Sequence, residues 1–299
     1  QEIIEQNRLK QLQELEAEKE GQRLRDVQAK TQKAAFTPFV QPSVPAKPNN
    51  SRTIVGILAV IGLMIGLPVF LIIAGYIFRG DNSTVGNPAT NKPASNNSNT
   101  LKNSIGMEFI KIPSGSFMMG SPTSEKDRSN DETQHQVTIS KDFYLGKYEV
   151  TQAQWKAVMN NNNPSYFKGD NLPVEQVSWD EAQAFIKKLN AKGEGTYRLP
   201  TEAEWEYSAR GGNSGKWSFG DDENELGKYA WYSPNSGSKT HEVGTKQPND
   251  FKLYDMHGNV WEWCEDLYGA YPSGNVTDPK GTTGSNRVNR GGGWFYDAR

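Results

Sequence analysis

The sequence has 299 residues and a single cysteine, Cys264. One thiol cannot close an intramolecular disulfide, and it also excludes a zinc site built from paired cysteines. The chain also has no excess of basic over acidic residues. The chain has 33 basic and 35 acidic residues, a balance that does not favour nucleic acid as a partner. The apolar fraction of 35% and the mean hydropathy of -0.75 are low for a wholly globular chain. We therefore expect part of the chain to be a polar tether.

The N-terminal part of the chain divides into segments of different composition. Residues 1–33 are rich in Glu, Gln, Lys, Arg and Leu and predict a polar helix, with a solvated helix and a coiled coil both left open. Residues 34–52 carry four prolines and predict an extended linker. Residues 79–103 are rich in Asn and Ser and predict a disordered tether. The chain starts at Gln1 without an initiator methionine or a secretory signal, so we expect a fragment.

Residues 53–78 are the long apolar run. Between Arg52 and Arg79 lie 26 uncharged residues (79 − 52 − 1), enough to cross about 30 Å of hydrocarbon, whereas a buried soluble helix is the alternative. Several basic residues precede the run, and Arg79 is the one close behind it. The positive-inside rule then predicts a single-pass membrane protein with a cytoplasmic N-terminus and an extracytoplasmic C-terminal domain.

Residues 104–299 read as one globular domain with an α+β pattern. Residues 107–121, MEFIKIPSGSFMMGS, alternate apolar and polar around a Pro-Ser-Gly break and predict a hairpin. Capping-box spacing predicts helices that begin at Thr151, Ser178 and Thr201. No helix is expected after Gly211, where Gly, Asn, Asp, Ser and Trp dominate. We expect a few short helices on an irregular antiparallel sheet.

Six strings carry a family resemblance, and they occur in the order MEFIKIPSGSFMMGS, YEVTQAQW, PVEQVSWDEAQAF, YRLPTEAEWEYSARGG, YDMHGNVWEWCED and RVNRGGGW. With them, residues 104–299 resemble the formylglycine-generating enzyme family, also called sulfatase-modifying factors. The resemblance implies a C-type-lectin-like α+β fold with sparse regular secondary structure. Because the family domain continues past the position of Arg299, we expect the C-terminus to be truncated.

The family's oxidases modify a sulfatase cysteine with copper held by a pair of their own cysteines. The first of that pair follows an Arg-Gly-Gly turn, which begins here at Arg290, and the matching position is Tyr296. Without soft thiolates copper is not expected, and no catalytic residue is assigned. In some relatives the segment after this turn binds ligands. The resemblance therefore makes Arg290, Trp294 and Tyr296 candidate binding residues.

The stretch DMHGNVWEWCED matches a family segment that holds a structural calcium. The implied ligands are Asp255, Gly258, Asn259, Val260 and Glu262. Calcium takes six to eight oxygens, and the alternative is a Glu262 that accepts hydrogen bonds from loop amides without metal. In a strand, Glu262 and Cys264 share one face. The surrounding acidic residues would raise the pKa of Cys264, which indicates a buried structural thiol rather than a nucleophile.

Two functional interpretations remain. One is a binding module on a membrane tether, which presents loops rich in Trp, Tyr, Asn and Gly to an extracytoplasmic protein, peptide or glycan. The other is an oxidoreductase that acts on a protein cysteine. Tyr296, at the position of a copper-binding cysteine in the family's oxidases, favours the binding module over the oxidoreductase. Whether the chain is an enzyme is left open. A receptor-like arrangement, in which a preceding portion acts inside the cell, rests on analogy.

Overall fold

The computed structural model describes residues 99–297. The predicted polar helix at 1–33, the linker at 34–52, the apolar run at 53–78 and nearly all of the tether at 79–103 lie outside this range. Within the described part of the chain, no helix combines the length and the apolar character needed to cross a membrane.

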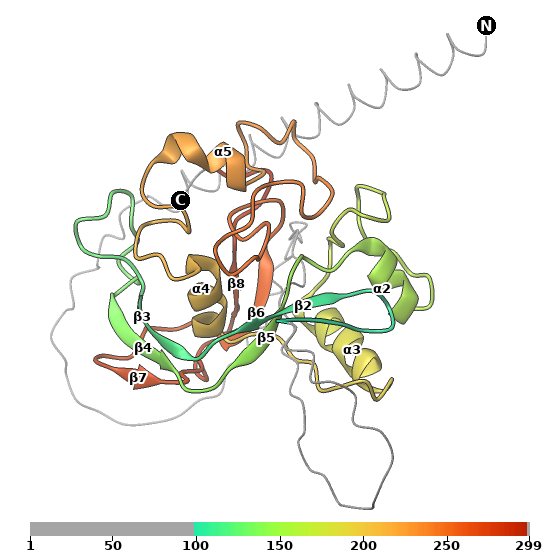
Figure 1. Cartoon of the computed structure of the whole chain (residues 1–299), viewed down its shortest axis with the longest axis horizontal. Helices are drawn as coiled ribbons and strands as arrows, with labels where there is room; N and C mark the ends of the chain where they lie inside the picture. Colours follow the sequence, from blue (N-terminus) through green and yellow to red (C-terminus); the bar gives the residue numbers. More distant parts are fainter. Residues whose placement is uncertain (1–98, 298–299) are drawn as a thin grey trace, which may run out of the picture. The chain divides into compact units, whose positions relative to one another are not determined.

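Short strands form three small sheets in this domain (Figure 1). The strands are β1 (Thr100–Lys102), β2 (Glu108–Ile112), β3 (Gly115–Met119), β4 (His135–Ile139), β5 (Phe143–Gly146), β6 (Glu262–Leu267), β7 (Val276–Thr277) and β8 (Arg287–Arg290). The first sheet has the order β1-β2-β5 and is antiparallel. In the second, β3-β4-β7, the last pair is parallel, and the third is the antiparallel pair β6-β8.

The helices begin at the three predicted capping boxes. They are α2 (Gln152–Val158), α3 (Trp179–Asn190) and α4 (Glu202–Arg210), followed by the 3-10 turn η1 (Glu223–Glu225) and the single turn α5 (Leu226–Tyr229). In each of the first three, the cap hydroxyl accepts from the N3 amide while the N3 side chain returns to the cap amide. Helix α4 ends at Gly211, whose φ of 59° is left-handed and suits a residue without Cβ. The turns η1 and α5 were not expected after this glycine.

The predicted hairpin of residues 107–121 is wrong. Strands β2 and β3 form as expected, but β2 pairs with β1 and β5, whereas β3 pairs with β4. The Pro-Ser-Gly break therefore joins two different sheets, and the amide of its Ser114 donates to the Asp142 carboxylate at 2.8 Å. Strand β1 also lies upstream of residue 104, inside the segment predicted as tether. Alternation predicts a strand, but it does not identify the strand's partner.

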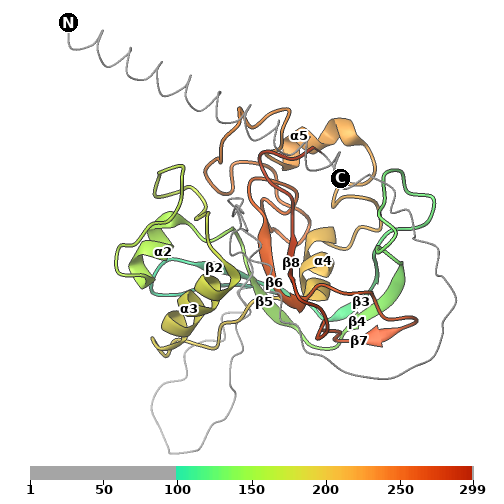
Figure 2. The same cartoon turned by 180° about the vertical axis from the view of Figure 1, so that it is seen from behind.

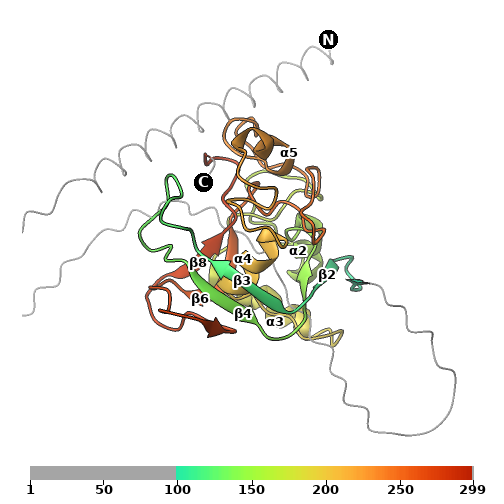
Figure 3. The ribbon, with the colours of Figure 1, turned by 60° about the vertical axis from the view of Figure 1, so that its left-hand side comes forward.

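Helix α4 is the central element, and it contacts β3, β4, β6 and β8 (Figure 2). The β3–β4 ribbon runs beside it (Figure 3). One apolar cluster lies under α2 and α3, where the Trp155 and Phe185 rings stack 5.0 Å apart. A second cluster surrounds α4 and contains Trp205 and the fully buried Cys264. A third, small cluster contains Trp217 and Leu226. Loops between these elements therefore rest on separate packed clusters rather than on one large sheet.

Candidate functional site

The turn before β6 has a backbone that few residues tolerate. Asp255 and Asn259 have φ values of 60° and 62°, in the left-handed region that Asp and Asn accept more readily than other side chains. A Cβ on Gly258 would lie 2.3 Å from the carbonyl oxygen of Trp231, so glycine is required there. The amide of Asn259 donates to that same oxygen at 2.7 Å. The sequence DMHGN thus holds the turn against a distant loop.

Glu149 joins this turn, although the sequence did not identify it. Asn259 Nδ2 donates to Glu149 Oε2 at 2.7 Å, and the main-chain amide of Val260 donates to Glu149 Oε1 at 3.1 Å. Asn259 Oδ1 accepts from the His241 amide at 2.9 Å. The Asn259 side chain is therefore engaged by protein groups on both its oxygen and its nitrogen. The one local signal was the position of Glu149 in the string YEVTQAQW.

Three carboxylates are buried around the turn: Glu149, Asp255 and Glu262. Burial raises the pKa of Glu262 to about 8, with the charge of Asp255 adding to the effect. Burial also raises the pKa of Asp255 to about 6 and that of Glu149 well above its ordinary value. Among the described residues, none of the three forms a salt bridge. Buried carboxylates without a cation cost free energy unless they are protonated or bind one.

The polar contacts of Asp255 and Glu262 test whether a cation fits. Glu262 Oε2 accepts from Trp205 Nε1 at 2.5 Å, and Asp255 Oδ2 accepts from the Gly244 amide at 2.7 Å. Asp255 Oδ1 is buried and has no partner. Within residues 99–297, however, no three Asp, Glu, His or Cys side chains converge on one point. The donor set thus fits an oxygen-bound cation only if main-chain carbonyls contribute, and calcium stays a prediction.

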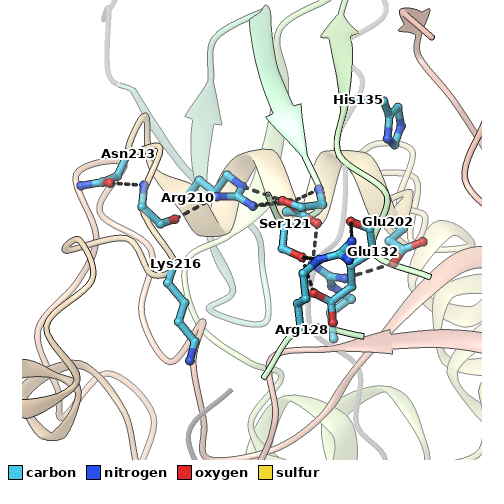
Figure 4. A network of polar contacts seen from close by, with 12 residues as sticks. Ser121, Arg128, Glu132, His135, Glu202, Arg210, Asn213 and Lys216 are labelled. Carbon is cyan, nitrogen blue, oxygen red and sulfur yellow. Dashed lines mark hydrogen bonds and ion pairs between the residues drawn. The ribbon is translucent and has the colours of Figure 1, made fainter. Parts of the chain in front are cut away.

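Arg290, a candidate binding residue, belongs to a charged network on α4. Figure 4 labels Glu202 and Arg210 of this network. Arg290 Nη1 lies 3.2 Å from Glu202 Oε1, and its Nη2 lies 2.6 Å from Glu206 Oε2. Glu206 also pairs with Arg210 at 2.7 Å. Burial favours a higher pKa for Glu206, but Arg290 and Arg210 outweigh it and hold the pKa below its ordinary value. The guanidinium also lies 5.3 Å from the Trp205 ring centroid, so it fastens β8 to α4.

The other two candidates belong to a continuous set of aromatic rings. Neighbouring centroids lie 5.0 to 6.2 Å apart along this set. We call it the aromatic face, and its members are Tyr166, Phe167, Trp261, Trp294, Phe295 and Tyr296. Tyr166 is 53% exposed and Tyr296 is 41% exposed, whereas Trp294 is buried beneath them. The Phe295 ring links those of Trp294 and Tyr296, whereas the Arg290 guanidinium is held by Glu202 and Glu206. The role of Trp294 and Tyr296 in binding stays a prediction.

Cys264 has the surroundings of a structural thiol, as predicted. It is fully buried in β6, and burial raises its pKa well above the ordinary value. Glu262, Cys264 and Asp266 are the buried side chains of this strand, which confirms the alternation read from the sequence. A thiol that is neither exposed nor ionised does not act as a nucleophile.

Residues 94–299 match the family model described as "Sulfatase-modifying factor enzyme 1-like domain". The chain is 32% identical to the "Chaperone protein LppX" of Paenibacillus barcinonensis over 62% of this chain and 78% of that protein. It is 39% identical to a formylglycine-generating enzyme of Streptomyces coelicolor over 42% of this chain, but it spans only 43% of that enzyme.

Two solved structures share the fold. Treponema denticola variable protein 1 superposes with a TM-score of 0.58 at 35% identity, covering 68% of this chain and 88% of that one. PvdO from Pseudomonas aeruginosa superposes with a TM-score of 0.60 at 29% identity, covering 70% and 89% respectively. Both superpositions cover most of the neighbour's chain, so the likeness extends over the domain rather than one motif.

Proposed function

The chain belongs to the sulfatase-modifying factor enzyme 1-like family, and on that premise we propose that its domain binds a protein or peptide ligand through the aromatic face. The observation that carries the proposal is the exposure of Tyr166 and Tyr296 above the buried Trp294. Tyr296 occupies the position that matches the oxidases' first copper cysteine. At this position the chain therefore has an aromatic ring that can contact a ligand, in place of a thiolate that can bind copper.

The packing beneath the exposed rings supports this role. Phe167 meets Trp294 edge to face at 5.6 Å, and Trp261 meets Tyr296 in the same way at 5.1 Å. The hydroxyl of Ser236 donates to the Trp294 carbonyl at 2.7 Å and ties this segment to a second loop. Rings held in place before binding lose little conformational entropy when a ligand arrives, and aromatic side chains dominate binding hot spots.

A display experiment tests the face. Peptides selected from a phage-displayed library on the wild-type chain should bind the Tyr166→Ala/Tyr296→Ala variant about 30-fold more weakly, which corresponds to about 2 kcal/mol for a hot spot. Tyr268→Ala is the matched control, because Tyr268 is equally exposed but lies outside the face. Equal binding of the selected peptides to the double variant would refute the proposal, as would a selection that yields no binders.

We also propose that the apolar run at residues 53–78 anchors the domain outside the cytoplasm. The support is the length of the uncharged run and the excess of basic residues before it. Because Cys264 is buried, single cysteines introduced by Ser51→Cys and Ser83→Cys can be labelled selectively in intact cells. A membrane-impermeant maleimide should label position 83 and not position 51. The reverse pattern would invert the topology, and labelling of both would remove the anchor.

A structural calcium is the third part of this proposal. The carboxylates of Asp255 and Glu262 and the carbonyl oxygens of Gly258 and Val260 would hold it, while Asn259 holds the turn. When bound, the ion would neutralise buried negative charge that otherwise requires protonation. The partnerless Asp255 Oδ1 supports this assignment. The test is urea denaturation of the wild type and Glu262→Gln at pH 5 and pH 8, with EGTA or calcium.

The oxidoreductase alternative is favoured by relatives that are named formylglycine-generating enzymes. It requires thiolate ligands for copper, and Cys264 is buried in β6. A cysteine-containing sulfatase peptide incubated with the copper-loaded chain and oxygen would reveal an aldehyde if this chemistry operates. Aldehyde formation would replace the binding proposal with catalysis.

A further inference from the structure

A cavity of about 430 Å³ lies between β4, β7, the first turn of α4 and the loops that follow β6. None of the rings of the aromatic face lines it. Its principal lining residues are Met119, His135, Glu202, Asp266, Tyr271 and Thr277. A volume of this order suits a small organic ligand. The cavity is therefore separate from the aromatic face.

His135 is the distinctive group of this cavity. Its side chain is buried, and its Nδ1 lies 3.0 Å from the carbonyl oxygen of Thr133. A carbonyl only accepts hydrogen bonds, so Nδ1 carries the proton and Nε2 of the neutral ring is an acceptor. That Nε2 is buried and has no partner. Figure 4 shows His135 set apart from the polar network around α4, with no contact drawn to it.

The carboxylates of the cavity already have partners. Glu202 Oε1 accepts from the Tyr271 hydroxyl at 2.8 Å and from Arg290 at 3.2 Å. Asp266 accepts from the Glu202 amide at 2.9 Å and from the Gly281 amide at 2.5 Å. Lys280, which also lines the cavity, pairs with Glu265 at 3.0 Å. A charged ligand would therefore have to compete with hydrogen bonds or an ion pair that these groups already make. What the lining does offer are oxygen and nitrogen acceptors that can take additional donors.

The remaining lining is apolar or hydroxylic. Met119, Val276 and the ring of Tyr271 provide apolar wall, and the Tyr271 ring lies 5.1 Å from the His135 ring. Thr277 provides a hydroxyl at the exposed side, on the short strand β7. A ligand with an apolar ring face and several hydroxyl donors matches this mixture better than an ion or a purely apolar molecule.

We propose that this cavity binds an uncharged, hydroxyl-bearing ligand of about monosaccharide size, with one hydroxyl donating to His135 Nε2 and a ring face packed beside Tyr271. This second site does not depend on the aromatic face. A peptide bound at the aromatic face and a polyol bound in the cavity would contact different elements of the fold.

The test uses the full chain labelled with ¹⁵N-histidine. The chain has three histidines, so its ring spectrum contains three spin systems. Methyl α-glucoside, methyl α-galactoside and methyl α-mannoside are titrated in turn, with methylammonium and acetate as charged probes. We expect at least one glycoside to shift the Nε2 resonance of His135 at millimolar concentrations, while His241 and His257 stay unchanged and neither charged probe shifts His135.

Two variants link that shift to the cavity. Thr277→Trp places an indole at the open side from an exposed position and should weaken glycoside binding at least ~10-fold by saturation-transfer NMR. His135→Phe retains an aromatic ring but removes the acceptor and should weaken binding roughly 5- to 10-fold. Lys192→Ala, at an exposed position after α3, is the control and should bind as the wild type does.

Three results would overturn the inference. No glycoside shifts His135 in the wild type, although the dispersion of its three histidine ring resonances shows that the chain is folded. Glycoside binding is unchanged in Thr277→Trp. Methylammonium or acetate shifts His135 in place of the glycosides, so that the site takes a charged ligand. Loss of peptide binding at the aromatic face affects none of these outcomes, so the two proposals fail separately.

Discussion

Glu262→Gln is the substitution that examines the buried turn most directly. Glu262 is enclosed in β6, and its carboxyl pKa is raised from an ordinary 4.5 to about 8, mainly by burial. Without a cation, the folded chain holds a proton on this residue between these pH values, whereas the unfolded chain does not. The stability that this proton contributes is fully present below pH 4.5 and is lost as the pH rises to 8.

The magnitude follows from proton linkage. Each pH unit in this window costs about 1.4 kcal/mol of unfolding free energy for one proton, so Glu262 accounts for roughly 5 kcal/mol at most. Asp255, whose pKa is raised from 3.8 to about 6, adds a loss of the same sign at the acidic end. Glutamine cannot ionise, so Glu262→Gln should remove the steeper part of the dependence and be the more stable chain at pH 8 in EGTA.

Calcium should reverse the sign of this dependence. A bound cation stabilises the ionised carboxylates, so its stabilising effect grows as the pH rises and the competing protons leave. Wild-type chain with excess calcium should therefore be more stable at pH 8 than in EGTA, with little difference at pH 5. Glu262→Gln should lose most of this increment because it lacks the anionic ligand.

The assay is urea denaturation at pH 5 and pH 8, with EGTA or calcium, for wild type and Glu262→Gln. Glu265→Gln is the matched control, because Glu265 lies on the same strand but on its less buried face, paired with Lys280 at 3.0 Å. Equal pH dependence of wild type and Glu262→Gln in EGTA would refute the burial argument. Superimposable wild-type curves with and without calcium at pH 8 would remove the metal.

Three further outcomes can be measured, two by urea denaturation and one by thiol reactivity. Arg290→Met leaves Glu206 buried with one partner fewer and should cost about 3 to 5 kcal/mol in urea denaturation. Arg198→Met, which breaks the more exposed pair with Glu204, should cost under about 1 kcal/mol. Equal losses of stability in the two variants would contradict the argument that Arg290 fastens β8 to α4. Gly258→Ala forces a Cβ within 2.3 Å of a carbonyl oxygen and should cost about 3 kcal/mol, and a neutral effect would show that the turn can shift. Cys264 should react with Ellman's reagent at the rate of global unfolding; rapid reaction in native buffer would contradict its burial.

The proposed peptide site and the proposed polyol site lie on different parts of the domain and differ in chemistry. The aromatic face presents exposed rings on a packed base, which suits a macromolecular surface. The cavity beside His135 encloses acceptors and apolar wall, which suits a small polyol. Glu202 belongs both to the charged network and to the lining of the cavity, so its pairing with Arg290 links the two.

Local features could be predicted from the sequence because their causes lie within a few residues. The caps at Thr151, Ser178 and Thr201 satisfy backbone groups three positions away, so spacing alone predicts where each helix begins. The alternation of β6 follows from the two-residue period of a strand, which is why the burial of Glu262 and Cys264 was foreseeable. The family motifs added the fold that arranges these pieces.

Contacts between distant residues were decided by the tertiary structure alone. Glu149 and Val260 are 111 positions apart, yet their hydrogen bond builds the turn. The separation of β2 from β3, the clamp on Arg290 and the unpaired nitrogen of His135 likewise depend on which chain segments pack together. No local sequence pattern encodes such pairs. The segments meet because they bury apolar side chains in common cores, and their buried polar groups must then form hydrogen bonds with one another.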